Sequence, residues 1–221
     1  MLDIEVDSSG KAELDLINSF AVPLKDPDYK DMKVQMASFQ GILSIVDKSK
    51  SPDTIQKAKE ALSFAVNKGL SGYLTQLGRD TLTALGEWGK QQVDLGKKTM
   101  AVEVVDLALT SDSSVSTWEK TKVNTKEGQT IGEKREKISM HDLAIESMIK
   151  IGGSVTPYND EELKLVNGVK QRLGNFAEKF KERTPLPNSI IRAINGVALL
   201  GALQGVKDVN TLNIKPNQPV K

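Results

Sequence analysis

Residues 115–139 read VSTWEKTKVNTKEGQTIGEKREKIS, and this stretch decides between an all-helical chain and one with a β part. In residues 115–123, β-branched side chains recur at alternate positions, which is typical of a strand. Residues 124–128 predict a turn, and residues 129–139 predict a second strand with five consecutive charges at 133–137. A buried strand cannot carry charges on both faces, so we expect a ribbon that projects into solvent at about 112–140.

Two segments upstream of this ribbon also predict β structure. Residues 102–109, with three valines and two leucines, predict a strand. Residues 2–6 and 12–16 alternate apolar and acidic side chains around the turn-forming residues 7–10, which predicts an N-terminal β-hairpin. An isolated hairpin is marginal in water, so we expect it to dock on the rest of the chain.

The other segments predict helices, because their apolar residues recur at spacings of three and four. Residues 29–48 carry one such stripe, and Ser51 followed by Pro52 is suited to start a second helix. Asn159 or Asp160 is suited to cap a later helix. The apolar stripe of that later helix consists of Leu165, Val169, Leu173, Phe176 and Phe180.

Residues 70–98 predict a helix in spite of five glycines, which each cost about 1 kcal/mol relative to alanine. Close packing against neighbouring helices explains them best, because a bulkier residue would hold two helices apart. A kinked or broken helix is the alternative. The glycines are Gly72, Gly78, Gly86, Gly89 and Gly96.

The order of hairpin, helices, strands and helices predicts an α+β fold that is mainly helical, with an N-terminal β-hairpin and a central antiparallel β segment. We expect a single globular domain over residues 1–221. Its C-terminal tail, at about 208–221, contains Pro216 and Pro219 and is expected to be extended.

The composition sets limits on function. The chain has 221 residues, with 30 Lys and Arg against 29 Asp and Glu, and no cysteine. Nucleic-acid-binding proteins usually show a basic excess, so such binding would need a local patch here. The lack of cysteine excludes disulfides, thiolate catalysis and cysteine-ligated metals. The sequence predicts no cofactor and no metal site.

The apolar runs and the first residues bear on location. No run of eighteen apolar residues predicts a membrane span. Residues 1–6 carry acids where a signal peptide would be basic and then apolar. We therefore expect a cytoplasmic protein, or one within a virus particle made in the cytoplasm.

His141 is the only histidine, and Ser139 and Asp142 lie beside it in the sequence. A Ser-His-Asp triad also needs a nucleophile on a sharp turn, and the chain has no Gly-x-Ser-x-Gly motif. Ser139 and Asp142 have the spacing of a capping box instead, which places His141 partly exposed in the first turn of a helix. The acids at 161–162 and at 26 and 28 are explained by a helix start and a proline turn. We expect no catalytic residues.

The ribbon provides the first candidate interaction surface. Its cations are interleaved with glutamates, which favours a solvated ribbon or a contact with a neighbouring subunit over a nucleic-acid contact. A tryptophan at 118 suits stacking on a base, which keeps nucleic-acid binding as an alternative. The candidate residues are Trp118, Lys120, Lys122, Lys134, Arg135 and Lys137.

The last helix, at about residues 188–206, provides the second candidate. It is apolar on nearly every side, and such a helix is buried in a core, buried in a subunit interface or inserted in a membrane. A core helix is the first interpretation, because the apolar run is short for a membrane span. As an interface helix it would use Ile191, Ile194, Val197, Leu200 and Leu203.

We therefore expect a non-enzymatic structural or assembly protein that acts through protein–protein contacts in a homo-oligomer or larger complex, for example as a component of a viral or phage particle. The expected partner is a second copy or another protein, whereas nucleic acid is not favoured and a membrane is not expected. Two alternatives stay open. One is a nucleic-acid-binding or regulatory protein that uses the charged ribbon, and the other is a membrane-active effector that releases its last helix.

Overall fold

A computed structural model describes residues 10–72, 74–112, 116–124, 131–181 and 188–211, and of these it describes residues 116–124, 131–137 and 205–211 by their backbone alone. These residues form eight helices and one pair of strands. The elements are α1 (Lys11–Lys25), α2 (Met32–Lys48), α3 (Pro52–Leu70), α4 (Thr75–Gln91), α5 (Leu95–Thr110), β1 (Ser116–Asn124), β2 (Ile131–Ser139), α6 (Met140–Gly153), α7 (Asp160–Phe180) and α8 (Asn188–Thr211).

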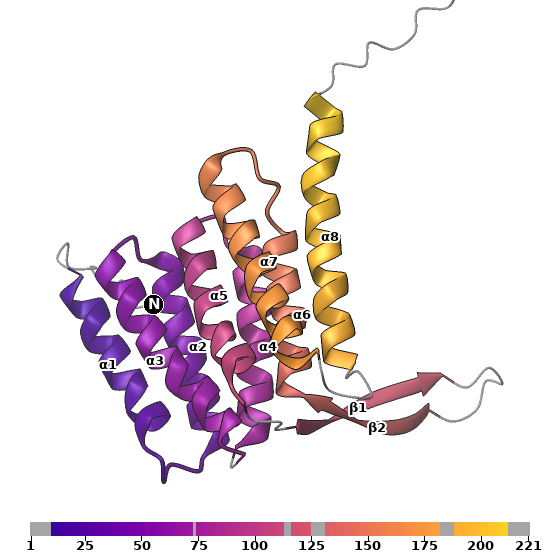
Figure 1. The fold of residues 1–221 in the computed structure, drawn as a ribbon. Coiled ribbons are helices and arrows are strands. Elements are labelled where there is room, and N and C mark those ends of the chain that lie inside the picture. The colour runs from indigo at the N-terminus through magenta and orange to yellow at the C-terminus, as the bar shows by residue number, and fades with distance from the viewer. Residues whose placement is uncertain (1–9, 73, 113–115, 125–130, 182–187, 212–221) are drawn as a thin grey trace, which may run out of the picture.

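The eight helices form an array of two layers (Figure 1). The odd-numbered helices α1, α3, α5 and α7 lie side by side in one layer, and the even-numbered helices α2, α4, α6 and α8 lie in the other. Consecutive helices reverse direction and pack across the two layers. Each inner helix is therefore covered on both sides within its layer, whereas α1 with α2 and α7 with α8 form the two ends.

Polar caps determine where several helices begin. The Ser51 hydroxyl oxygen accepts a hydrogen bond from the Thr54 backbone N–H at 3.3 Å, which caps α3. Asn159 and Glu162 form a reciprocal capping box at the start of α7. The five apolar residues predicted for the α7 stripe are all buried. The sequence predictions of these caps and of this stripe are confirmed.

The α+β fold class expected from the sequence is wrong. Among the described residues, the β structure is limited to the pair β1–β2, and the core is built by helices alone. The segment predicted as a strand at 102–109 lies inside α5. Residues 11–16 of the predicted N-terminal hairpin lie in α1, and residues 1–9 lie outside the described part of the chain.

The reason for both errors is burial. α5 lies between α3, α4, α6 and α7, so it buries Val102, Val104, Val105 and Leu109 on several sides at once. A helix that is buried nearly all round has no apolar periodicity, and its valines then imitate a strand. In α1 the buried residues are Ile17, Ala21, Pro23 and Leu24. The helical spacing of Ile17, Ala21 and Leu24 is obscured in the sequence by the alternation at 12–16.

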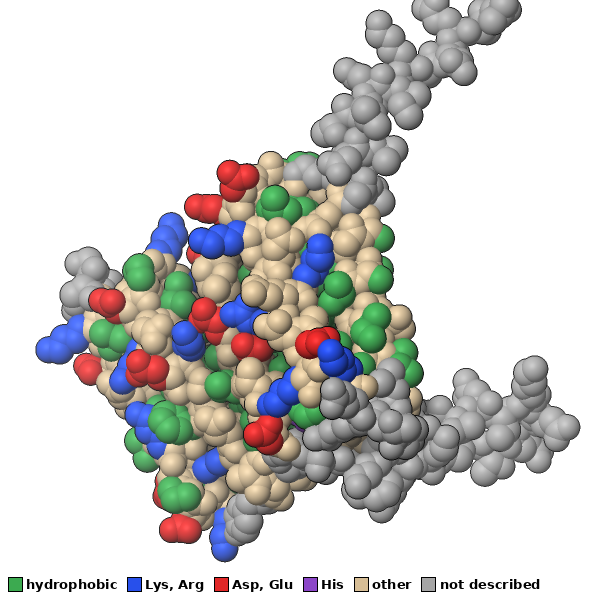
Figure 2. All heavy atoms as spheres, viewed as in Figure 1, with side chains coloured by type: hydrophobic (Ala, Val, Ile, Leu, Met, Phe, Trp, Pro, Cys, Tyr) green, Lys and Arg blue, Asp and Glu red, His purple; other side chains and the backbone are tan. Residues whose placement is uncertain are grey.

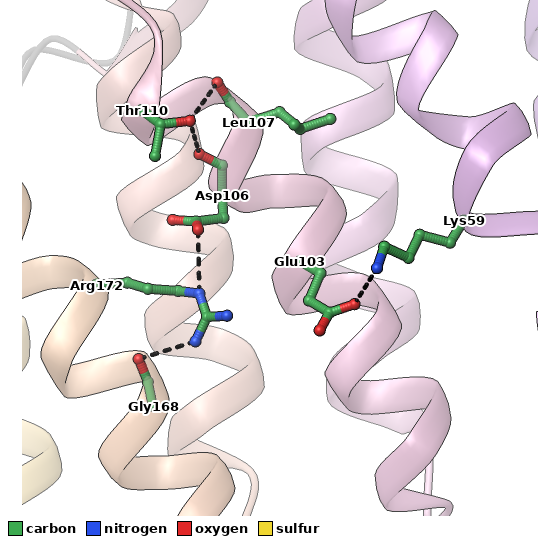
Figure 3. Close-up of polar contacts among 7 residues, drawn as sticks. All are labelled: Lys59, Glu103, Asp106, Leu107, Thr110, Gly168 and Arg172. Atoms are coloured by element: carbon green, nitrogen blue, oxygen red, sulfur yellow. Dashed lines mark hydrogen bonds and ion pairs between the residues drawn. The ribbon is translucent and has the colours of Figure 1, made fainter. Parts of the chain in front are cut away.

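Ion pairs join neighbouring helices within each layer. In the odd layer, Lys59 of α3 contacts Glu103 of α5 at 2.7 Å, and Arg172 of α7 contacts Asp106 of α5 at 3.2 Å (Figure 3). In the even layer, Lys150 of α6 contacts Glu87 of α4 at 2.8 Å. These pairs are partly exposed, so each contributes modestly to stability.

α8 differs from the sequence prediction in length and in environment. It continues to Thr211, so its last turn occupies residues expected to begin the extended tail, and residues 212–221 lie outside the described part of the chain. Its interpretation as a central core helix is wrong. α8 packs on α6 and α7 at one end of the array, and its other side faces solvent (Figure 1).

Candidate interaction surfaces

The outer side of α8 is an exposed apolar face. The inner side buries Ile190, Ala193 and Leu200 against α6 and α7. On the outer side, hydrophobic side chains gather along the edge of the molecule (Figure 2). Four large residues are 39–51% exposed there: Ile191, Ile194, Leu199 and Leu203. We call these four residues the α8 face. No charged residue occurs between positions 193 and 204, so the middle of this face is uncharged.

Sequence reasoning found part of this face. Of its five candidates, Ile191, Ile194 and Leu203 are exposed, but Val197 is half-buried and Leu200 lies in the core. It missed Leu199, which is about half exposed. The helix is apolar on so many sides that no hydrophobic pattern distinguishes its covered side from its open one.

A groove runs along each flank of α8. The groove between α7 and α8 has a volume of about 480 Å³, and the groove between α6 and α8 about 290 Å³. Small residues from both helices line the first groove, namely Gly174, Ala177 and Ala198. A Cβ added at Gly174 would meet no atom within 4 Å, so this part of α7 is open. The α8 face is thus a ridge between two grooves. Helices pack on one another by placing the ridges of one in the grooves of the other, so this surface has the shape that such packing needs.

Charges of both signs form the rim of this surface. On the α7 side, Lys181 pairs with Glu178. On the α6 side, Lys150 contacts Glu146 at 2.9 Å, and its hydrogen bond to Glu87 raises the pKa of Lys150. A lysine is charged in the neutral range at its ordinary pKa, and the raised pKa of Lys150 extends the charged range to higher pH.

Arg192 and Asp142 complete the rim at the lower end of α8. Arg192 Nε lies 3.8 Å from Asp142 Oδ1, which is too long for a hydrogen bond. Among the described residues, that buried oxygen has no hydrogen-bond partner. An acid and a base therefore occur together here as well.

The opposite end of the array is more polar. The solvent-facing side chains of α1 are mainly charged or hydrogen-bonding, with Leu16 and Val22 as the large apolar exceptions. The polar members are Lys11, Asp15, Asn18, Ser19 and Lys25. The two ends of the molecule therefore have different surface chemistry.

The ribbon is the second candidate surface. β1 and β2 pair antiparallel with Trp118 opposite Lys137 and Lys120 opposite Arg135. Thr121 lies opposite Lys134. The pair projects from the lower end of the array, on the same side as α8 (Figure 1). Five of the six candidate residues from the sequence occupy register positions of one parity, and Lys134 occupies the other.

His141 has a structural environment rather than a catalytic one. Its ring packs on Phe176 and Phe180, with centroids 5.0 and 5.6 Å away, and its Nε2 lies 3.1 Å from the Ser111 carbonyl oxygen. The Ser139 hydroxyl donates to Asp142 Oδ2 at 2.7 Å, so these neighbours do not form a triad with the ring. His141 is buried, not partly exposed as the sequence suggested.

The acidic pairs also have structural roles. Glu162 Oε2 accepts hydrogen bonds from the Tyr158 and Asn159 backbone N–H groups ahead of α7. Asp26 Oδ1 accepts from the Asp28 backbone N–H in the turn after α1. Among the described residues, no three His, Asp or Glu side chains gather closely enough to hold a metal ion.

A further groove lies between α5 and α7 and has a volume of about 840 Å³. Arg172 lies at its wall, where it bonds Asp106 and the Gly168 carbonyl oxygen (Figure 3). Burial raises the pKa of Asp106, and the guanidinium of Arg172 opposes that shift. The lining also includes the Thr99 hydroxyl, the carboxylates of Asp160 and Glu161, and Lys164.

A buried lysine, Lys98, lies where the C-terminal ends of α4 and α6 meet the start of α5. Lys98 Nζ donates to the carbonyl oxygens of Gly89 and Lys90 and to the Ser154 hydroxyl at 2.6–3.1 Å. Its partners are neutral, and burial lowers the pKa of Lys98. The ammonium lies at the C-terminal ends of α4 and α6, where a positive charge is favourable. Lys98 therefore acts as a helix cap.

No described helix has the length and hydropathy needed to cross a bilayer. Comparisons of the chain with models of protein families, with curated proteins and with solved structures found no match.

Proposed function

We propose that the protein is a non-catalytic assembly protein that pairs with a second copy of itself through the α8 face. The observation that carries this proposal is the exposed row of Ile191, Ile194, Leu199 and Leu203 between two grooves. Single exposed apolar residues are ordinary, but four large ones on the solvent side of one helix, flanked by grooves, favour an interface. Burial of each of these half-exposed side chains contributes roughly 1 kcal/mol to association.

The difference between the two ends of the array favours a second copy as the partner. In stacked helical architectures, a terminal element needs a polar outer face to be stable in water. The exposed residues of α1 are mostly polar, whereas α8 has no charged residue over positions 193–204 and Asn195 is its one exposed polar residue there. A symmetric pair uses the same patch twice, while head-to-tail stacking would need a complementary apolar patch on α1. Pairing through α8 in both copies therefore covers the apolar end and leaves the polar one in water.

The rim charges agree with such a pair. Each flank of α8 presents an acid and a base together, Glu178 with Lys181 on one side and Glu146 with Lys150 on the other. A surface that has both acidic and basic side chains at its rim is able to pack against a second copy of itself, because each charged group of one copy has an oppositely charged group of the other within reach. A strongly acidic or strongly basic partner would meet like charges on either flank.

The test is the self-association of the full chain and of Ile194→Glu. We expect sedimentation equilibrium of the wild type to show a reversible monomer–dimer equilibrium. In the dimer of the variant, the carboxylates introduced in both copies would be placed in an apolar contact, so we expect the dissociation constant to rise by at least about 100-fold.

The matched control is Val22→Glu, which adds the same charge at an exposed valine on α1. It should dimerise like the wild type, and far-UV circular dichroism should show all three chains equally helical. A wild type that stays monomeric at every concentration would disprove the proposal. So would a Val22→Glu chain that loses the dimer while Ile194→Glu keeps it.

A further inference from the structure

The register of the ribbon sorts its charges by face. In an antiparallel pair, directly opposed residues share a face, and so do alternate residues along each strand. One face therefore contains the opposed positions 118 with 137, 120 with 135 and 122 with 133. The other contains 119 with 136 and 121 with 134. Charges that are interleaved in the sequence are separated by this register.

The separation leaves one face strongly basic. Four cations and a tryptophan share it with the single acid Glu133. The other face has the cation Lys134 with the acids Glu119 and Glu136. We call the first one the Lys120 face; its cations are Lys120, Lys122, Arg135 and Lys137.

The opposed pairs in the middle of the ribbon have like charges. Lys120 lies opposite Arg135, and Glu119 lies opposite Glu136. Like charges directly opposite one another destabilise a strand pair by up to about 1 kcal/mol. A purely structural ribbon would be more stable if each of these pairs consisted of one acid and one base. An anion bound on the Lys120 face removes the repulsion there.

We infer that the Lys120 face binds the phosphate backbone of duplex DNA, an activity separate from pairing through α8. Each strand of nine residues spans roughly 30 Å, and its same-face cations repeat at about 6.7 Å, which presents a linear array to a linear polyanion. The major groove of B-form DNA, about 12 Å wide, admits a two-stranded ribbon, whereas the deep, narrow groove of duplex RNA does not. The net charge of the whole chain is only +1, so the overall charge of the protein adds little to the attraction of this face for DNA.

A partner copy is a poorer match for this face. The ribbon projects on the same side as α8, so a dimer could bring it close to the rim of the second copy. That rim has both signs together, as at Glu146 with Lys150, and offers no row of acids to four cations. The predominantly basic face, with four cations and one acid, fits a polyanion better.

The test uses full-length protein and a fluorescently labelled duplex of mixed sequence in an anisotropy titration. Four phosphate contacts predict that affinity falls about 150-fold between 50 and 200 mM salt. Lys120→Gln should weaken binding about tenfold and reduce the salt slope by about one. Lys134→Gln is the matched control, since it removes the same charge from the other face, and it should change affinity less than about twofold.

Four results would overturn the inference. The first is no binding of the duplex at low salt. The second is an equal loss in Lys120→Gln and Lys134→Gln, which would reveal attraction by net charge alone. The third is a Lys120→Gln chain that binds DNA normally but dimerises less well, which would make the ribbon a clasp on the second copy. Because dimerisation through α8 is measured without DNA, failure of this inference is distinguishable from failure of the proposed function. The fourth result is tighter binding of duplex RNA than of duplex DNA, which would reject the assignment to the DNA major groove.

Discussion

At the scale of single residues, glycines allow neighbouring helices to approach closely. Gly69 of α3 faces Gly78 of α4, and a Cβ built on Gly69 would lie 2.2 Å from the Gly78 Cα. Gly86 of α4 similarly lies against Ser147 of α6. The sequence prediction that glycines in residues 70–98 serve close packing is confirmed at Gly78, Gly86 and Gly89. Gly72 instead adopts a positive φ of 84° in the turn before α4.

Gly69→Ala is expected to lower the free energy of unfolding by about 1–3 kcal/mol or more, because the added methyl group meets backbone that cannot move without separating α3 from α4. Gly174→Ala is the control, at a helical glycine whose Cβ position is empty. It should raise stability by up to about 1 kcal/mol through helix propensity. Urea denaturation of dilute, monomeric protein measures both, and equal effects would contradict the packing argument.

The second prediction at this scale concerns Lys98. Lys98→Met removes a donor from the terminal carbonyl groups of α4 and should destabilise the protein by about 1–3 kcal/mol near neutral pH. Because burial lowers the pKa of Lys98 below 10.5, the unfolded chain binds this proton more tightly than the folded one. Stability contributed by this group therefore rises with pH between its folded pKa and 10.5.

The stability difference between wild type and Lys98→Met should accordingly grow as pH approaches 10.5. Comparing the two chains cancels the titration of the other lysines to first order. A difference that stays constant over this range would mean that Lys98 does not lose its proton more readily in the folded state.

At the scale of elements, α5 is held to both neighbours in its layer by ion pairs, to α3 through Glu103 and to α7 through Asp106 (Figure 3). Arg172→Met should destabilise the protein by about 1–2 kcal/mol at pH 7, because it leaves a half-buried carboxylate without its cation. Asp106→Asn should cost less, since the amide stays neutral.

The difference between these two variants should shrink in acid. Burial already raises the pKa of Asp106, and loss of Arg172 raises it further, so protonation neutralises the uncompensated carboxylate as pH falls. Denaturant unfolding at pH 7 and near pH 4 checks this. If Arg172→Met were equally destabilised at both pH values, lost packing rather than charge would be the cause.

Sequence alone predicts the elements whose signals are local. The caps at Ser51 and Asn159 and the stripe of α7 depend on residues a few positions apart, and the structure has them as expected. The prediction for α5 is wrong because helices from several parts of the chain bury it on several sides, so its apolar residues show no helical periodicity. The α+β class fails with it, since β propensity yields to burial.

The candidate surfaces were predictable to different degrees. The sequence points to α8 and to the ribbon, but it does not reveal which side of α8 the other helices cover. The sorting of ribbon charges depends on register, and a slip of one residue would move every side chain of one strand to the other face. Pairing of Lys120 with Arg135 could therefore be known only from the strand alignment.

At the scale of the whole molecule, the two-layer array predicts a gradient of protection. α3, α4, α5 and α6 have neighbours on both sides in their layers, so their backbone amides should exchange most slowly with deuterium. α8, covered on one side, should exchange faster in dilute protein and more slowly as concentration rises and pairs form. α1 should be insensitive to concentration. Equal responses of α1 and α8 would argue against pairing at one end only.

A molecule with one self-complementary apolar surface, here the α8 face, is able to bind only one other copy. In the proposed pair, each copy covers the α8 face of the other, so we expect no third copy to bind. The polar outer side of α1 is the reason for this expected limit. Replacing the exposed residues Asp15, Asn18 and Ser19 with leucines would create a second apolar surface, on α1. Each copy could then bind two others, one at each end, and fibres could form.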